Sequence, residues 1–128
     1  MTIPFWCLLA AAVLPYLLAF TGARHRKLQL GSVDNRHPRQ QIAQLTGTGA
    51  RYYAAQQNAW EALAVFTAAV FVAHAAGADA GKSALAALLF IAARVLHAVF
   101  YVVDQDKLRS LSFMVGFGSC IWLFALAM

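Results

Sequence analysis

The chain has 128 residues, of which 62% are hydrophobic and 12% are charged, and its formal net charge is +5. Soluble domains average about 45–50% apolar and about 25% charged residues, so this chain has too little polar surface to coat a water-soluble globule. These numbers exclude an ordinary soluble enzyme and predict one all-α integral membrane domain over residues 1–128.

Four apolar segments predict the transmembrane helices. They cover about residues 3–22, 48–76, 82–103 and 108–127, and each is near or above the roughly 20 residues that a spanning helix needs. The long polar connection is about residues 23–47, which is rich in Arg, Gln, Asn and Gly. No Lys or Arg precedes the first segment and no clear small-x-small cleavage site follows it, so we interpret it as a retained helix. The expected architecture is a four-transmembrane-helix bundle.

Basic residues are concentrated in the first connection, which contains Arg24, Arg26, Lys27, Arg36 and Arg39. The second connection offers only Lys82, whereas the third offers Lys107 and Arg109. The positive-inside rule then predicts a cytoplasmic location for the first and third connections, with both termini periplasmic in a bacterial inner membrane. No aromatic-basic motif accompanies the basic loop, and it adjoins two spans, so we expect no nucleic-acid partner.

The second predicted helix carries polar side chains on one face. Arg51, Gln57, Asn58 and Glu61 fall within a sector of about 120° when each residue advances about 100°. Ionisable side chains at membrane depth cost about 2.5–3.5 kcal/mol each on insertion scales, and they normally face the bundle interior or a water-filled cavity. We therefore expect this face to point inward.

The third and fourth predicted helices add a second polar group. Arg94, His97 and Tyr101 have the spacing i, i+3, i+7, which confines them to a sector of about 60°. Asp106 is the expected N-cap of the last helix, and Arg109 and Ser110 lie in its first turn. An arginine at this positive helix end is unfavourable unless an anion lies nearby.

These polar faces are expected to meet near the cytoplasmic side. Arg51, Arg94 and Arg109, with only Glu61 as a buried carboxylate, leave an excess of positive charge. The pattern favours a small anionic, water-soluble ligand with free carboxylates and an amine for Glu61, such as a peptide, together with an apolar partner that enters from lipid.

Structural interpretations of the same residues stay open. Arg51 and Arg94 could instead snorkel toward the membrane surface, or form structural ion pairs with Glu61 and Asp104. His97, taken without its neighbours, is more typical of polar packing than of catalysis.

The sequence contains no pattern typical of a metal site or of redox-active cysteines. His74 has no second ligand at suitable spacing, and Cys7 and Cys120 lie far apart without a C-x-x-C pattern, so we expect no metal site and inert, buried thiols.

Three motifs, in order along nearly the whole chain, resemble one family. They are DNRHPR at 34–39, the R-x6-N-x2-E pattern of Arg51, Asn58 and Glu61, and AARVLHAVFY at 92–101 followed by KLRS at 107–110. This arrangement resembles the membrane-associated proteins in eicosanoid and glutathione metabolism (MAPEG), in a small bacterial-type form similar to microsomal prostaglandin E synthases and microsomal glutathione transferases. Such proteins are four-helix homotrimers that bind glutathione between subunits.

The resemblance implies a glutathione-dependent transferase or peroxidase that acts on lipophilic electrophiles in contact with membrane lipid. Arg109, with Ser110 beside it, would stabilise the glutathione thiolate. The implied glutathione-binding set is Arg51, Gln57, Asn58, Glu61, Arg94, His97 and Tyr101. The alternative is a noncatalytic membrane scaffold of the same fold that binds a lipid or a partner, because fold alone does not establish catalysis.

Two positions depart from the family pattern. Ala54 stands where some members have an arginine, and Phe113 stands where the prostaglandin synthase resemblance leads one to expect a tyrosine. Arg51, one turn earlier, is the candidate replacement for the missing arginine.

Overall fold

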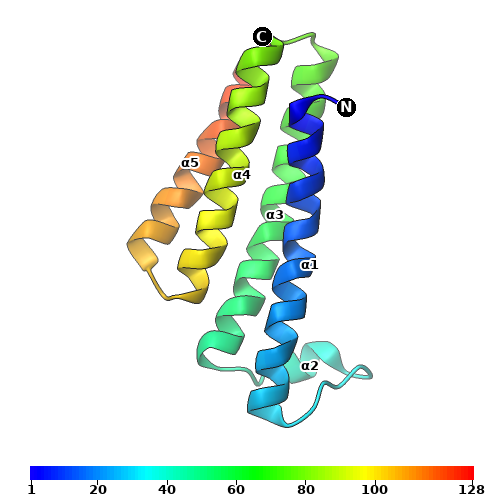
Figure 1. Cartoon of the computed structure of the whole chain (residues 1–128), viewed down its shortest axis with the longest axis vertical. Helices are drawn as coiled ribbons and strands as arrows, with labels where there is room; N and C mark the ends of the chain where they lie inside the picture. The colour runs from blue at the N-terminus through cyan, green and yellow to red at the C-terminus, as the bar shows by residue number, and fades with distance from the viewer.

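The computed structural model describes residues 1–128 as an antiparallel helical bundle without strands (Figure 1). Four helices are long and apolar enough to cross a membrane: α1 (Ile3–Leu30), α3 (Gly47–Ala75), α4 (Ala80–Val102) and α5 (Asp106–Ala125). The short α2 (Pro38–Ile42) lies in the connection between α1 and α3. Both termini lie at one end of the bundle, and α2 lies at the other (Figure 1). The prediction of an all-α, four-helix membrane bundle is confirmed.

The first helix is longer than its apolar segment. It was expected to end near residue 22 but continues to Leu30, so that the connection shortens from about 23–47 to 31–46. Residues 23–30 are mostly polar but contain no Gly or Pro to interrupt the helix. The helix ends where Gly31 adopts φ +77° and its N–H donates to the carbonyl of Lys27 at 3.0 Å.

The turn before α5 corrects one detail of the sequence analysis. Gln105, not Asp106, is the N-cap of α5. The chain reverses through Asp104, which has the left-handed φ of +63°, and this turn brings Asp106 into the first helical turn. Its carboxylate remains near the positive end of the helix, where a negative charge is favourable.

The loop between α1 and α3 is organised by Gln41, which is buried. Its side-chain oxygen accepts from Arg26 Nη2 at 2.7 Å and from the Asp34 N–H at 2.9 Å, while its Nε2 donates to the Ser32 carbonyl at 2.8 Å. These bonds fix the loop against the end of α1.

The DNRHPR motif begins at a turn held by its aspartate. The backbone N–H groups of His37 and Arg36 donate to Asp34 Oδ1 at 3.1 and 2.7 Å. Because these bonds favour the ionised carboxylate, they hold the pKa of Asp34 below its ordinary value.

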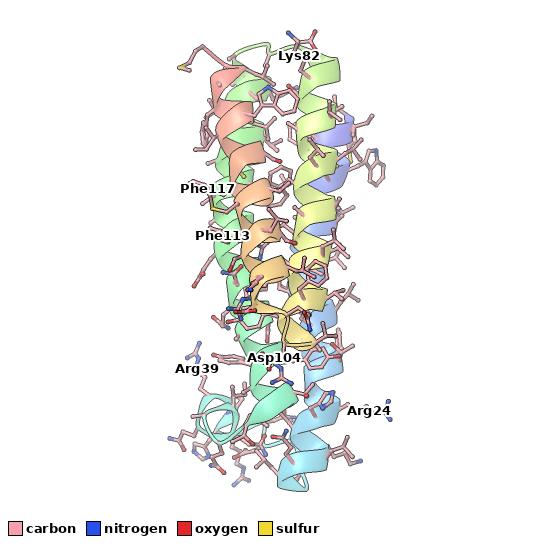
Figure 2. All side chains as sticks on the ribbon, turned by 90° about the vertical axis from the view of Figure 1, so that its left-hand side faces the viewer. Arg24, Arg39, Lys82, Asp104, Phe113 and Phe117 are labelled. Atoms are coloured by element: carbon pink, nitrogen blue, oxygen red, sulfur yellow. The ribbon has the colours of Figure 1, made fainter.

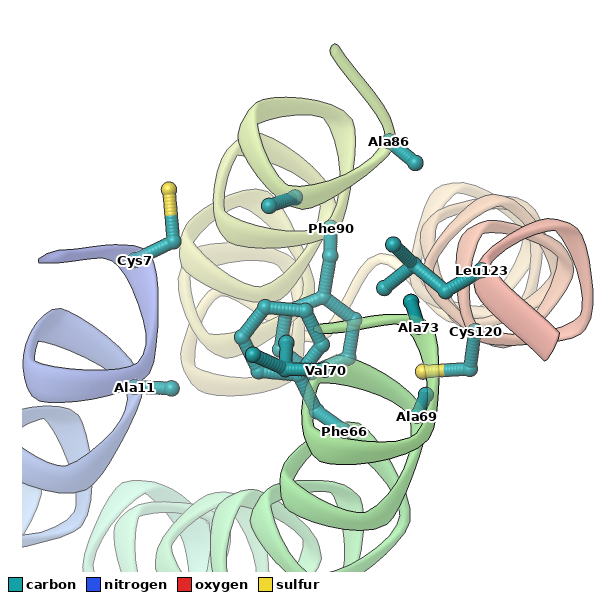
Figure 3. Packing of buried hydrophobic residues seen from close by; sticks show 11 residues of the cluster. Cys7, Ala11, Phe66, Ala69, Val70, Ala73, Ala86, Phe90, Cys120 and Leu123 are labelled. Carbon is teal, nitrogen blue, oxygen red and sulfur yellow. The ribbon is translucent and has the colours of Figure 1, made fainter. Parts of the chain in front are cut away.

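The larger of two apolar clusters lies in the half of the bundle nearer the termini. Figure 3 shows how its side chains pack. The rings of Phe66 and Phe90 stack with centroids 3.8 Å apart, and Leu123 of α5 packs beside them. Alanines let the helices approach closely around these rings, namely Ala69, Ala73, Ala86 and Ala87. Cys7 and Cys120 are buried free thiols within this core. The other half of the bundle combines a smaller apolar cluster with the buried polar side chains Arg94 and His97; that cluster consists of Leu18, Ala55, Ala59 and Ala98.

Candidate functional site

Arg94 of α4 is the charged side chain at the centre of the candidate site. It is only 3% exposed, and its Nη2 donates to Asn58 Oδ1 at 2.6 Å and to the Asn58 carbonyl at 3.3 Å. Asn58 Nδ2 in turn lies 3.4 Å from Glu61 Oε2. An amide therefore stands between the guanidinium and the carboxylate, and the direct Arg94–Glu61 ion pair considered from the sequence is not formed.

A glycine on α5 makes room for this arginine. A Cβ atom placed on Gly116 would lie 3.4 Å from Arg94 Cδ and 3.6 Å from Ala93 Cβ. Gly116 is buried, so α5 can pack directly over the Arg94 side chain. The aliphatic part of the arginine is covered while its Nε remains without a hydrogen-bond partner.

A pocket of about 200 Å³ opens beside this group. Asn58, Glu61 and Arg94 supply its polar side, whereas its apolar wall consists of Ala62, Val65, Phe90, Phe113, Phe117 and Cys120. The rings of Phe113 and Phe117 are nearly parallel, with centroids 6.2 Å apart, and both project from the same side of α5 (Figure 2). The pocket thus combines polar groups with an aromatic wall.

His97, Tyr101 and Arg109 form a second cluster, toward the turn between α4 and α5. The His97 ring is 3% exposed and lies 5.6 Å from the Tyr101 ring and 6.3 Å from the Phe113 ring. His97 Nδ1 has no hydrogen-bond partner. Arg109 Cζ lies 4.5 Å from the centre of the Tyr101 ring, a cation–π contact. Phe113 therefore connects this cluster to the pocket that Arg94 lines.

The Arg109 guanidinium has no carboxylate within ion-pair distance in the protomer. It stands in the first turn of α5, where the helix dipole is positive, so its charge favours an anion at this place. Ser110 is exposed beside it, and its hydroxyl donates to the Asp106 carbonyl at 3.0 Å.

Arg51 has a structural role within the protomer. Its Nε donates to the Val102 carbonyl at 3.0 Å, its Nη2 donates to Thr48 Oγ1 at 3.0 Å, and its Nη1 lies 3.6 Å from Asp104 Oδ2. These contacts fasten α3 to the end of α4. The ion pair with Asp104 that the sequence left open is present, and Arg51 does not line the pocket of Arg94.

Gln57 points to another side of α3. It is exposed and lines a separate pocket of about 220 Å³, together with Arg26 and Arg39 from the α1–α2 region. The predicted polar sector of about 120° on this helix is therefore divided: Asn58 and Glu61 line one pocket, Gln57 lines another, and Arg51 contacts the end of α4.

Sequence reasoning missed most of the apolar wall of this pocket and the glycine that packs against Arg94. Phe117 lies one turn after Phe113 and shares its face, so the i, i+4 spacing of aromatic residues was the available signal. The close approach at Gly116 left no such signal, because the sequence does not reveal which side chain faces a glycine. No group of three or more His, Cys, Asp or Glu side chains is placed to hold a metal ion.

Comparison with protein families identified a relationship that comparison with single proteins did not. Searches of curated proteins and of solved structures found no significant match. The model of the MAPEG family matches residues 3–128, which is essentially the whole chain and includes all four spans and both polar clusters. The chain therefore belongs to the MAPEG family.

Proposed function

We propose that the protein is a glutathione-dependent membrane transferase or peroxidase that acts on lipophilic electrophiles. MAPEG membership supports glutathione-related transferase or isomerase chemistry at the level of the family, whose members generally use glutathione as substrate or cofactor. The observation that carries the proposal for this chain is the pair of guanidiniums, Arg94 and Arg109, which have no carboxylate partner within the protomer.

Glutathione carries two carboxylates, an ammonium group and a thiol, and the polar groups of the site match this pattern. Arg94, which Asn58 holds in place without cancelling its charge, would bind a carboxylate. Glu61, exposed on the same side, would accept from the ammonium group. His97 and Tyr101 would complete the polar lining toward Arg109.

Arg109 is the proposed thiol-activating residue, with Ser110 beside it. A thiol has a pKa of about 8.5, and a guanidinium that stays protonated lowers this pKa by stabilising the thiolate. The proton leaves to water, and the thiolate attacks an electrophilic carbon whose leaving group departs with the bonding electrons. In the peroxidase reaction it attacks a peroxide oxygen, which yields an alcohol and a sulfenic acid that a second glutathione converts to the disulfide and water.

The electrophile would approach from lipid along the aromatic wall. Phe113 and Phe117 are exposed on α5 and border the pocket, so an apolar molecule dissolved in the bilayer can contact them. Water-soluble and lipid-soluble reactants would thus meet between Arg109 and the Phe113 ring.

A homotrimer with glutathione between subunits is part of the proposal. Glu61 lies well inside an apolar span yet is exposed in the protomer, and a carboxylate facing lipid at such a position is unfavourable. A neighbouring subunit, together with the ligand, would cover it.

The test is a glutathione titration of the purified protein in nanodiscs, followed by thermal unfolding and by conjugation of a model aromatic electrophile. Glutathione should raise the melting temperature of the wild type. Arg109→Ala should lower kcat/KM by about a hundredfold or more, because it removes a charge that stabilises the thiolate. Lys107→Ala, an exposed cation in the same helical turn, is the matched control and should retain activity.

A second candidate is a noncatalytic scaffold of the same fold. Arg51 favours it in part, because this arginine is engaged with Val102, Thr48 and Asp104 and serves to hold helices together. The scaffold predicts no thermal shift with glutathione and loss of assembly in Glu61→Ala. Equal conjugation rates in wild type and Arg109→Ala would remove Arg109 from the mechanism.

A further inference from the structure

A second pocket, of about 350 Å³, lies at the opposite end of the bundle, between the start of α1, the end of α3 and the start of α4. His74 on its rim is sixteen residues beyond Asn58 in α3, which corresponds to about 24 Å along the helix. The pocket is therefore separate from the proposed glutathione site and does not depend on that proposal.

The lining of this pocket is apolar and made largely of small residues. Val70 and Leu123 form part of its buried floor. Alanines and a glycine surround the space that larger side chains would have filled: Ala73, Gly77, Ala78, Ala80 and Ala84. Pockets of a few hundred Å³ with apolar walls and a few convergent polar groups are typical of small-molecule sites.

Ser83 is the buried polar group of the pocket. It is 7% exposed, and its Oγ has no hydrogen-bond partner. Other helical hydroxyls in the chain donate to the carbonyl one turn earlier, namely those of Thr21, Thr67, Ser110, Ser112 and Ser119. Ser83 does not, and a buried hydroxyl without a partner is unfavourable, so a ligand atom that bonds to it is favoured.

His74 adds a second polar group at the rim. Its ring packs edge-on against Phe5 of α1, with centroids 5.0 Å apart and an interplanar angle of 81°. No hydrogen bond engages its ring nitrogens within the protomer, and the side chain is exposed, so it can meet a polar group at the water boundary.

The charge of the lining indicates the class of ligand. No Lys, Arg, Asp or Glu lines the pocket. A phosphate or zwitterionic headgroup would lose its hydration there without a compensating charge, whereas an uncharged hydroxyl needs only a hydrogen bond. The pocket is surrounded by the ends of membrane-spanning helices, so lipid molecules can approach it.

We propose that this pocket binds a small, uncharged amphiphile, an alkyl chain ending in a hydroxyl group, whose oxygen bonds to Ser83 while its chain lies against Val70 and Leu123. The alcohol would enter from the membrane leaflet at the end of the bundle that carries the termini.

The experiment uses 1-octanol carrying a diazirine, photolysed with the full-length protein in nanodiscs, and maps the labelled residues by mass spectrometry. Wild-type protein should be labelled at residues 70–84. 1-Octanol should compete with this labelling, and octane should compete much less. Ser83→Ala should weaken the competition by 1-octanol about tenfold. Ser112→Ala, which removes a buried serine already bonded to the Leu108 carbonyl, should label like the wild type.

A filling variant tests the space itself. Ala84→Phe occupies the pocket and should abolish the labelling, whereas Ala92→Phe, on an exposed face of the same helix, should not. The proposal is overturned if label spreads over the lipid-facing helices, or if 1-octanol competes as strongly in Ser83→Ala as in the wild type. It is also overturned if octane or octanoate competes as well as 1-octanol. Ser83→Ala changes a single oxygen atom, so it keeps the proposal testable should Ala84→Phe fail to fold.

Discussion

Asn58 connects the two charged side chains of the pocket without neutralising either. Its amide oxygen accepts from Arg94 at 2.6 Å, and its amide nitrogen faces Glu61 at 3.4 Å. A carboxylate in the same place would cancel the positive charge of Arg94. The amide therefore provides an acceptor for one nitrogen of the buried guanidinium and leaves its charge available to a ligand.

Replacing this amide should separate stability from binding. Asn58→Ala should lower the free energy of unfolding by about 1–3 kcal/mol, because buried Arg94 loses its partner. Asn58→Asp should keep most of the stability but weaken glutathione binding, because its carboxylate neutralises Arg94. Thermal unfolding with and without glutathione measures both effects.

The neighbouring Gln57 provides the control. It is exposed and faces another pocket, so Gln57→Ala should change stability by less than about 0.5 kcal/mol. Glutathione binding to Asn58→Asp with wild-type affinity would contradict a role of Arg94 in binding the tripeptide.

At the scale of the helices, the packing of α5 on α4 depends on one glycine. A side chain larger than Ala at Gly116 would meet Arg94 and Ala93, so Gly116→Leu should destabilise the bundle by about 1–3 kcal/mol and displace Arg94. Gly118→Leu is the matched control, because a Cβ at Gly118 meets no atom within 4 Å. Melting temperatures and glutathione affinity distinguish the two variants, and equal behaviour would argue against close packing at Gly116.

The loop between α1 and α3 should respond to acid through Asp34. Its folded pKa lies below the ordinary value, so its contribution to loop order is present above that ordinary value and is lost as the pH falls through the lowered pKa. The amide chemical shifts of Arg36 and His37 should follow this titration in NMR spectra. Asp34→Asn keeps an acceptor but cannot ionise, and the transition should vanish. A titration midpoint at or above the ordinary aspartate pKa would contradict the stabilisation of ionised Asp34 by these backbone hydrogen bonds.

The helices were predictable from the sequence to the extent that apolarity defines them. The apolar runs located all four spans, but they did not predict that α1 continues through polar residues to Leu30, because a helix that leaves the bilayer needs no apolar side chains. Helical spacing placed Asn58 and Glu61 on one face, and Arg94 and His97 on another.

Spacing could not decide which neighbour each polar residue meets. Arg51 contacts the end of α4, and Gln57 turns toward the loop, although both fall in the sector that contains Asn58. The contact partners depend on how α3 is rotated against α1 and α4, and the spacing of polar residues within one helix carries no information on that rotation.

At the scale of the whole molecule, charge is distributed unevenly between the two ends. Arg24 and Arg39 lie at the end that carries the loop, and Lys82 lies at the end that carries the termini (Figure 2). We propose from this asymmetry that the loop faces the cytoplasm of a bacterial inner membrane and that both termini are periplasmic.

Cysteine labelling tests the orientation. In a variant with Cys7 and Cys120 replaced by Ala, Lys82→Cys should react with a membrane-impermeant maleimide on intact cells. Arg39→Cys should react only after the membrane is permeabilised. The opposite pattern would reverse the orientation and place the proposed glutathione site on the periplasmic side.

The unequal lengths of the helices affect how deep the site lies. α1 and α3 have 28 and 29 residues and extend past the turn between α4 and α5 (Figure 1), whereas α5 has 20 residues. Twenty residues span about 30 Å, which is about the thickness of the hydrocarbon layer, so α5 is only just long enough to cross it. A hydrocarbon layer of that thickness centred on α5 would place Arg109 at the boundary between acyl chains and headgroups, and a thicker layer would submerge it. If Arg109 acts on glutathione as proposed, the thickness of the host bilayer would then affect how readily the tripeptide reaches it.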